Sequence, residues 1–477
     1  MSVGKLPVDW KIVELGNLIN LSTGKLDANA ADKDGQYPFF TCAESISQIN
    51  SWAFDSSAVL LAGNGSFSIK KYTGKFNAYQ RTYVIEPILI KTEFLYWLIR
   101  GNIEKITENG RGSTIPYIRK GDITDICVAL PSQAEQTLIA EKLDTLLAQV
   151  ESTKARLEQI PIILKLFRQA VLAAAVRGKL TEDWYSSSNQ VDTESLLKEI
   201  EIERDKAKGN RLIKPSFGKK RNISPLFEIS SNLWGWVCLE QICATNNNAL
   251  KAGPFGSALK KADCVEDGYK VYGQEQVISG SESLETYRIN DEKYEQLKSC
   301  KVGPGDILIS LVGTIGKALV LSSQAEVGII NPRLVKITLH EAVNPKYIKI
   351  YLDSPISHGF FKGFSHGGTM DILNLGILKE LPITLPPTEE QAEIVRRVEQ
   401  LFAYADTIEK QVNSALSCVN NLTQSILAKA FRGELTEQWR AENPELISGD
   451  NSAAALLEKI KAERAASTGK KASRKKS

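Results

Sequence analysis

The sequence has very few of the side chains that usually carry covalent chemistry or bind metals. Three histidines occur in 477 residues, His340, His358 and His366, and none lies in an HxxxH spacing. The seven cysteines are scattered and odd in number, and no Cys-x-x-Cys pair is present. These absences argue against a structural zinc site and against a disulfide scaffold.

Nucleotide-binding motifs are missing as well. The stretch "LVGTIGKA" (311–318) has Leu311 where a phosphate-binding loop needs Gly, and Ala318 where it needs Ser or Thr. An Asn/Asp-Pro-Pro-aromatic motif of the kind found in amino-methyltransferases does not occur. We therefore expect no catalytic residue, no metal and no cofactor in this chain.

Targeting and membrane signals are also lacking. The apolar run "AVLAAAV" (170–176) is too short to span a bilayer, and "MSVGKLPVDW" at the start lacks the apolar region of a signal peptide. A cytoplasmic protein without a membrane partner is therefore expected. The formal net charge of +3 neither indicates nor excludes a nucleic-acid partner.

What the sequence does contain is a phrase of ten residues that occurs twice. "AVRGKLTEDW" at 175–184 returns as "AFRGELTEQW" at 430–439, an offset of 255 residues (430 − 175). The same offset aligns "ALPSQAEQ" (129–136) with "TLPPTEEQ" (384–391). The chain therefore contains an internal repeat. The first parts of the two copies have diverged from each other, whereas the second parts, which we call the well-kept parts, remain similar.

Shorter similarities extend the repeat. "LLKEIEIER" (196–204) resembles "LLEKIKAER" (456–464), and the Trp-x4-Leu frame of Trp10 matches that of Trp234. We therefore predict six segments: a first domain (1–131), a central conserved region with a long helix (132–208), a basic linker (209–232), a second domain (233–386), a C-terminal conserved region with a long helix (387–466) and a basic disordered tail (467–477).

The well-kept parts have the apolar spacing of long packed helices. Apolar residues recur at alternate steps of three and four, which is a heptad pattern. Each helix should end at a left-handed glycine, Gly178 or Gly433, and Pro161 should kink the first. Antiparallel packing would bury both apolar stripes, although an ordinary helical hairpin would show the same seam. The seam comprises Ile139, Leu143, Leu146, Val150, Leu157, Ile394, Val398, Leu401, Ile408 and Val412.

The diverged parts are rich in short β-prone runs broken by Gly, Asn and Asp. Each also holds one amphipathic stretch typical of a helix, at 93–101 and 345–354. We predict an α+β fold: two mixed α/β domains with curved sheets, separated by two long antiparallel helices that form a coiled-coil-like spacer, with an internal pseudo-twofold repeat.

These motifs, duplicated and in this order, resemble the specificity subunits of Type I restriction–modification enzymes over nearly the whole chain. The matching features are the Trp-x4-Leu entry to each domain, the Leu-Pro…Glu-Gln start of each long helix, and the Arg-Gly-x-Leu-Thr-Glu-x-Trp phrase that follows it. The stretches "GPFGSALKK" (253–261) and "GTIGK" (313–317) are similar to phrases of the family's recognition domains.

The resemblance implies that each domain is a target recognition domain that reads one half of a bipartite asymmetric site in double-stranded DNA. The helices would fix the gap between the half-sites. Two methyltransferase (modification) subunits, which bind S-adenosylmethionine and methylate adenine N6, would dock on the well-kept regions. Two restriction subunits could add cleavage that uses ATP and Mg. This chain itself would be a non-catalytic subunit.

Several polar loops of the two domains suit contacts with phosphates or base edges. The candidates are Lys70, Lys71, Tyr72, Lys75, Gln80, Arg81 and Arg111 in the first domain, and Lys251, Ser257, Lys260, Lys261, Gln274, Gln276, Thr314 and Lys317 in the second. The repeated phrase adds residues with a structural or partner-docking role: Arg177, Gly178, Trp184, Arg432, Gly433 and Trp439.

Three other interpretations remain open. The chain could be a non-catalytic adaptor, with two ligand-binding domains on a coiled-coil strut and no affinity for DNA. It could be an enzyme with active sites in the diverged domains, although the scarcity of histidine argues against that. Within the family, it could serve modification alone, without a restriction partner.

Overall fold

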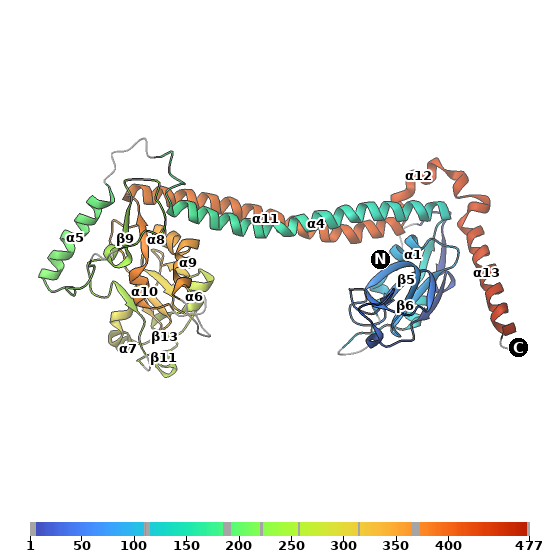
Figure 1. Cartoon of the computed structure of the whole chain (residues 1–477), viewed down its shortest axis with the longest axis horizontal. Helices are drawn as coiled ribbons and strands as arrows, with labels where there is room; N and C mark the ends of the chain where they lie inside the picture. The colour runs from blue at the N-terminus through green and yellow to red at the C-terminus, as the bar shows by residue number, and fades with distance from the viewer. Residues whose placement is uncertain are drawn as a thin grey trace. The chain divides into compact units, whose positions relative to one another are not determined.

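The computed structural model describes residues 6–108, 110, 115–184, 192–219, 223–255, 258–312, 315–364 and 373–474. The chain divides into two compact units (Figure 1). Unit 1 comprises Met1–Glu158 and Val412–Ser477, and unit 2 comprises Gln159–Gln411. Each unit therefore combines one mixed helix-and-sheet domain with a part of both long helices, α4 (Gln133–Val176) and α11 (Thr388–Phe431).

The domain of unit 1 is built on a six-stranded sheet with the order β2-β7-β5-β6-β3-β4. Its longest pairing is the antiparallel one of β5 with β6, while β3 joins β6 in parallel. A separate antiparallel pair, β1 with β8, connects the start of the domain to its end. The elements are β1 (Lys11–Glu14), β2 (Ile19–Thr23), β3 (Tyr37–Phe40), β4 (Ser47–Ile49), β5 (Phe54–Ala62), β6 (Ile69–Ala78), β7 (Thr82–Pro87), α1 (Thr92–Gly101), α2 (Ile103–Thr107), α3 (Lys120–Thr124) and β8 (Cys127–Leu130).

The domain of unit 2 carries two sheets, of four strands (β10-β18-β15-β16) and of five strands (β11-β13-β12-β17-β14). The pair β9 with β19 takes the same place as β1 with β8. The strands are β9 (Gly235–Cys238), β10 (Leu250–Ala252), β11 (Cys264–Val265), β12 (Tyr269–Tyr272), β13 (Arg288–Ile289), β14 (Lys301–Val302), β15 (Ile307–Ser310), β16 (Ala318–Val320), β17 (Gly328–Ile330), β18 (Leu334–Ile337) and β19 (Pro382–Leu385). The helices are α5 (Thr193–Gly209), α6 (Gln274–Ser279), α7 (Asp291–Gln296), α8 (Pro345–Leu352), α9 (Pro355–Gly363) and α10 (Leu375–Glu380).

Each domain has the predicted amphipathic helix, α1 in unit 1 and α8 in unit 2. In α1 the buried side chains include Leu95, Leu98 and Ile99, and Leu98 and Ile99 follow Leu95 by three and four residues, which places them on one face. Both helices pack into the main hydrophobic core of their own unit. The predicted class, a mixed helix-and-sheet protein with two domains, is confirmed.

The long helices pack against each other within each unit. In unit 2, the guanidinium of Arg168 on α4 binds Asp406 and Glu409 on α11, at 2.6 and 2.8 Å. In unit 1, Leu427 of α11 shares a core with Ile139 of α4. The start of α4 thus lies beside the end of α11 in unit 1, and the end of α4 beside the start of α11 in unit 2.

The predicted helix ends are confirmed. Gly178 and Gly433 have φ angles of 80° and 79°, a left-handed conformation that costs glycine least. All ten predicted seam residues are buried or half-buried, but Leu147 is more buried than Leu146. This shift by one residue is expected because a helix of 3.6 residues per turn drifts away from a strict heptad. The helix α4 continues through Pro161.

A buried carboxylate joins three separate parts of unit 1, and we call this set of contacts the helix-end clamp. Glu135, in the first turn of α4, is fully buried. It accepts hydrogen bonds from the Trp10 indole (2.8 Å), the Thr436 hydroxyl (2.6 Å) and the Arg440 guanidinium (2.6 Å). The clamp therefore fixes the entry of the domain and the start of α4 to the phrase that follows α11.

Unit 2 contains the corresponding clamp, in which the carboxylate comes from the second copy of the repeat and the hydroxyl from the first. Glu390, in the first turn of α11, is fully buried and accepts from the Trp234 indole (2.8 Å) and from the Thr181 hydroxyl (2.7 Å). Thr181 belongs to the phrase after α4. Each repeated phrase therefore closes the clamp of the other copy.

The similar segments 196–204 and 456–464 also bind the domain of the opposite copy. Arg204 of α5 donates to the carbonyl of Gln241 at 2.7 Å, in the short 3-10 helix that follows β9. Arg464 of α13 (Ala453–Arg474) donates to the carbonyl of Gly16, in the 3-10 helix that follows β1. The tail of each copy therefore binds the domain of the other.

Two predicted segments differ from the structure. The segment 209–232 is not simply a solvated linker, because Ile213 is buried and Phe227 packs on the core of unit 2. The tail was predicted to be disordered from residue 467, but the backbone is helical up to Arg474. It extends a helix that has already formed, and its Ala, Lys and Arg residues favour that conformation.

Glu393 of α11 gives a pH-dependent contribution to stability. It accepts from Arg396 (2.6 and 2.7 Å) and Arg397 (2.6 Å), and these guanidinium groups lower its pKa to about 2. Because the pKa is lower in the folded state, the contribution is full above the ordinary value of 4.5 and is lost as the pH falls toward 2. We expect Glu393→Gln to lower the melting temperature at pH 7. The difference in melting temperature between the wild type and this variant should disappear by pH 2–3. Thermal unfolding across pH, with exposed Glu389→Gln as the control, tests this; equal shifts in both variants contradict it.

Candidate nucleic-acid interface

The turn before β7 brings two predicted contacts together in unit 1. Gln80 and Arg81 are exposed and line a hollow of about 310 Å³, together with Tyr83 and Tyr117. The Tyr83 hydroxyl donates to the carbonyl of Ile118 at 3.1 Å, which fixes the ring in this wall. The hollow thus presents a guanidinium, an amide and aromatic surface, which are groups that contact bases and phosphates.

The other unit 1 candidates lie on β6 and are already engaged. Lys70 donates to the carbonyl of Ala43 at 2.7 Å, and burial lowers its pKa. Lys71 lies 3.7 Å from Asp144 of α4, and Tyr72 packs against the Phe40 ring. Lys71 and Lys75 are nevertheless both exposed, and Lys75 lies over the Trp52 ring with Nζ 4.8 Å from its centroid.

Unit 2 contains a larger hollow, of about 570 Å³. Lys260 and Lys261, both exposed and both predicted, line it. Arg333 and Tyr287 lie in the same wall and had not been predicted. A carboxylate, Glu275, also lines the hollow, so its field is mixed rather than purely cationic.

The two predicted glutamines of unit 2 are not available as contacts. Gln276 is fully buried; its oxygen accepts from the backbone of Gly273 (2.9 Å) and its nitrogen donates to the carbonyl of Leu284 (3.0 Å). Gln274 is 9% exposed and donates to the Ser310 hydroxyl at 2.8 Å. Both side chains are used internally, which corrects their assignment as base-reading candidates.

The remaining candidates are spread out. Lys317 is exposed and donates to the carbonyl of Ile278 at 2.7 Å, and Lys251 is half-buried on β10. Arg111, Ser257 and Thr314 lie outside the described residues.

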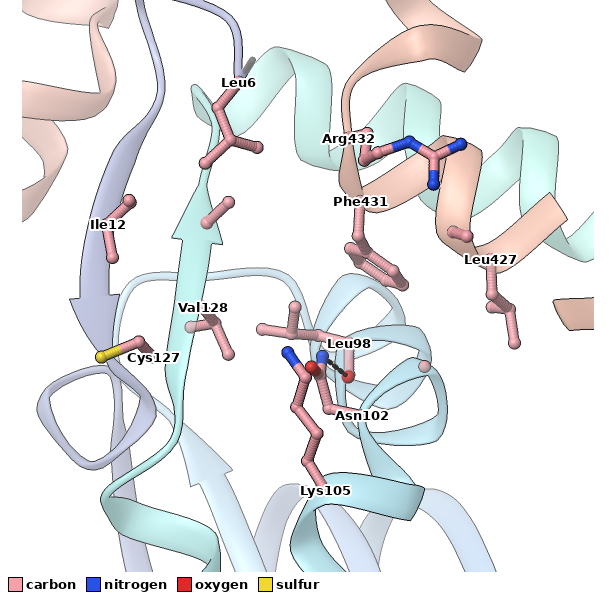
Figure 2. A pocket seen from close by; sticks show the side chains of 13 residues that line it. Leu6, Ile12, Leu98, Asn102, Lys105, Cys127, Val128, Leu427, Phe431 and Arg432 are labelled. Atoms are coloured by element: carbon pink, nitrogen blue, oxygen red, sulfur yellow. Dashed lines mark hydrogen bonds between the residues drawn. The ribbon is translucent and has the colours of Figure 1, made fainter. Parts of the chain in front are cut away.

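A third hollow, in unit 1, is lined by residues of β1, β8, α1 and the end of α11 and is mainly apolar (Figure 2). Figure 2 shows Leu98 and Phe431 on one side of it and Ile12 and Val128 on the other. Arg432, from the repeated phrase, lines its rim and forms an ion pair with Glu434 at 2.5 Å.

In unit 2 the equivalent arginine, Arg177, lies over the Phe227 ring, 5.2 Å from its centroid. Phe227 in turn packs on Trp236, the counterpart of Ile12, at 4.9 Å. Unit 2 therefore covers this surface with its own chain.

Comparison with known proteins identifies the family. Residues 7–161 and 234–417 match the model of the Type I restriction modification DNA specificity domain. The chain belongs to this family. Its members recognise DNA sequences as non-catalytic subunits of Type I restriction–modification complexes, and this chain is such a specificity subunit.

Relatives and a solved structure agree with this assignment. The chain is 58% identical to the specificity subunit of the Type I restriction enzyme EcoDI from Escherichia coli, over 100% of both chains. It is 45% identical to that of EcoBI from Escherichia coli, over 80% of this chain and 74% of the relative. The HsdS subunit from Thermoanaerobacter tengcongensis has the same fold, with a TM-score of 0.51 at 16% identity, over 91% of this chain and 99% of that one.

The sequence prediction did not include Arg333, which lines the hollow of unit 2. It stands directly before β18, the last strand before the amphipathic helix of its domain, and Arg81 stands directly before β7, the last strand before α1. The two specificity domains have diverged too far for this correspondence to show in the sequence alone.

Proposed function

We propose that this specificity subunit reads a bipartite asymmetric site in double-stranded DNA, one half-site for each unit. The pair of crossed clamps carries the proposal. Glu135 and Glu390 bind each domain to the start of one long helix and to the phrase that ends the other. The two clamps attach the domains to the helices in equivalent ways. Because the domains themselves have diverged, one pseudo-twofold repeat can read two different half-sites.

The paired long helices act as the spacer in this proposal. Each has 44 residues, which corresponds to about 66 Å at 1.5 Å per residue. Two DNA readers held by a stiff connection require half-sites at a fixed separation and helical phase. The gap would then be set by helix length and the bases by the domains.

The partners follow from the same duplication. Two equivalent surfaces suit two copies of one methyltransferase subunit, and a restriction-competent complex would add two restriction subunits. S-adenosylmethionine, ATP and Mg would be bound by those partners and not by this chain. The apolar hollow beside Arg432 is one surface open to a partner, whereas Gly178 and Gly433 serve the helix ends.

We place this assembly in the cytoplasm, where it meets DNA. One window of α4 is apolar enough to cross a membrane by length and composition, with a mean hydropathy of 1.5, and 28% of it is buried. In a subunit of a DNA-acting family, pairing with α11 and contact with partners account for that apolar surface.

Selection from random duplex DNA, with the chain purified together with its partners at stated salt, tests the proposal. We expect two short, different motifs at one fixed spacing. A single contiguous motif would exclude the two-reader geometry. No enrichment, with a methyltransferase partner confirmed in the sample, would favour an adaptor with two ligand-binding domains.

A further inference from the structure

Arg81 of unit 1 occupies a defined position at the end of a strand pair. It stands directly before β7, whose first residue, Thr82, pairs with Ala62 of β5. The carbonyl of Arg81 accepts a hydrogen bond from the backbone of Gly63 at 2.8 Å. The carbonyl of Gly63 accepts in turn from Ile118 at 3.0 Å.

Arg333 of unit 2 has the same set of backbone bonds. It stands directly before β18, whose first residue, Leu334, pairs with Ser310 of β15. The carbonyl of Arg333 accepts from Leu311 at 3.0 Å, and the carbonyl of Leu311 accepts from Leu373 at 2.9 Å. The two arginines therefore occupy equivalent places in sheets whose sequences have diverged.

Both arginines are exposed and line the hollow of their own domain beside tyrosine side chains. Among the described residues, neither forms an ion pair with a carboxylate, whereas Arg288 of unit 2 is held by Glu326 at 2.7 Å. Because both arginines are exposed and are not paired with a carboxylate of the described residues, their guanidinium donors can bind an acceptor outside the chain. The N7 and O6 acceptors of guanine match this fork, and this is the commonest specific contact to DNA.

The charges nearby favour a base edge over a phosphate. In unit 2, Glu275 lines the same hollow as Arg333. In unit 1, Asp27 accepts from Gln80, the neighbour of Arg81, at 3.5 Å. A carboxylate repels phosphate, but it can accept a hydrogen bond from the amino group of cytosine, the partner base of guanine.

Gln274 contacts the Arg333 side chain. Its side-chain nitrogen is committed to the Ser310 hydroxyl at 2.8 Å, which turns its oxygen toward the Arg333 guanidinium, 3.4 Å away. The side chain is 9% exposed. A glutamine buried in this way is placed to orient the arginine rather than to contact a base.

We infer that Arg81 and Arg333 are equivalent specificity-determining residues, each reading one guanine of its own half-site, and that Gln274 is a positioning residue for Arg333. The inference rests on the proposed reading of a bipartite DNA site. It adds the residues and the base that each domain uses at one position.

The test compares the base preferences of variants assembled with their partner subunits, by sequencing the sites methylated in a random library. Arg333→Ala should weaken the preference for guanine at one position of one half-site by about five- to 150-fold and leave the other half-site unchanged. Arg81→Ala should do the same in the opposite half-site. Gln274→Ala should weaken the same position as Arg333→Ala, and the double variant should lose no further position.

Lys298→Ala serves as the control, because Lys298 is an exposed cation of the unit 2 domain that is paired with Glu295. It should leave every base preference unchanged. An Arg333→Ala variant that weakens all sequences equally, with a shallower salt dependence, would identify a phosphate contact and overturn the inference. Unchanged preferences would overturn it as well. If the wild-type complex itself selects no DNA, the proposed function fails first.

Discussion

Insertion of four residues into each long helix should lengthen the gap between the two half-sites by one to two base pairs and leave the bases of both half-sites unchanged. The insertions are placed between Glu158 and Gln159 and between Gln411 and Val412, where each helix passes from one unit to the other. Four residues add about 6 Å of helix, and successive base pairs are about 3.4 Å apart. One full turn also nearly preserves the three-and-four apolar seam.

The measurement is the same selection from random DNA, performed on the assembled complex. A control replaces four exposed residues near each insertion point without changing helix length, and its gap should equal that of the wild type. A lengthened variant that keeps the original gap, or that reads different bases, would show that the helices do not set the spacing.

Replacement of Glu135 by alanine should destabilise unit 1 by about 3–5 kcal/mol, the usual cost of removing one partner from a buried ion pair. Glu135 is fully buried and Arg440, its cationic partner, is 12% exposed at the side chain. The substitution also leaves the Trp10 indole and the Thr436 hydroxyl without their acceptor.

Hydrogen exchange measured by mass spectrometry on the assembled complex can follow the two units separately. Glu135→Ala should speed exchange in unit 1 and leave unit 2 near its wild-type rates. Glu135→Gln keeps the shape of the side chain and one acceptor oxygen. Its exchange rate in unit 1 should fall between those of the wild type and Glu135→Ala. Glu141→Ala is the matched control, since Glu141 is exposed on the same helix, and it should change stability by less than about 0.5 kcal/mol. If Glu135→Ala exchanges no faster than this control, the clamp is not needed for stability.

Patterns tied to backbone geometry could be predicted from the sequence. The glycine ends at Gly178 and Gly433, the amphipathic helices and the apolar seam all follow from local periodicity or from a conformation that favours one residue type. Such signals need no knowledge of distant contacts, so divergence between the two copies does not obscure them.

Spatial pairing could not be predicted in the same way. The sequence places Glu135 and Thr181 in one copy, but the structure pairs Glu135 with Thr436, because the helices run in opposite directions. Gln276 is a residue type that often reads bases, yet its side-chain amide is hydrogen-bonded to the backbone of Gly273 and Leu284. Arg333 was missed for the converse reason: only the hydrogen bonds of its backbone reveal that it matches Arg81.

The crossed clamps also determine the order in which the chain can be completed during synthesis. Unit 2 uses the continuous stretch 159–411, whereas unit 1 needs both ends of the chain. The first domain leaves the ribosome early, but its core waits for Leu427, Ala430, Leu456 and Ile460. Unit 2 can therefore finish folding once residue 411 has been made, whereas the domain of unit 1 keeps an open apolar surface until Leu456 and Ile460 have been made.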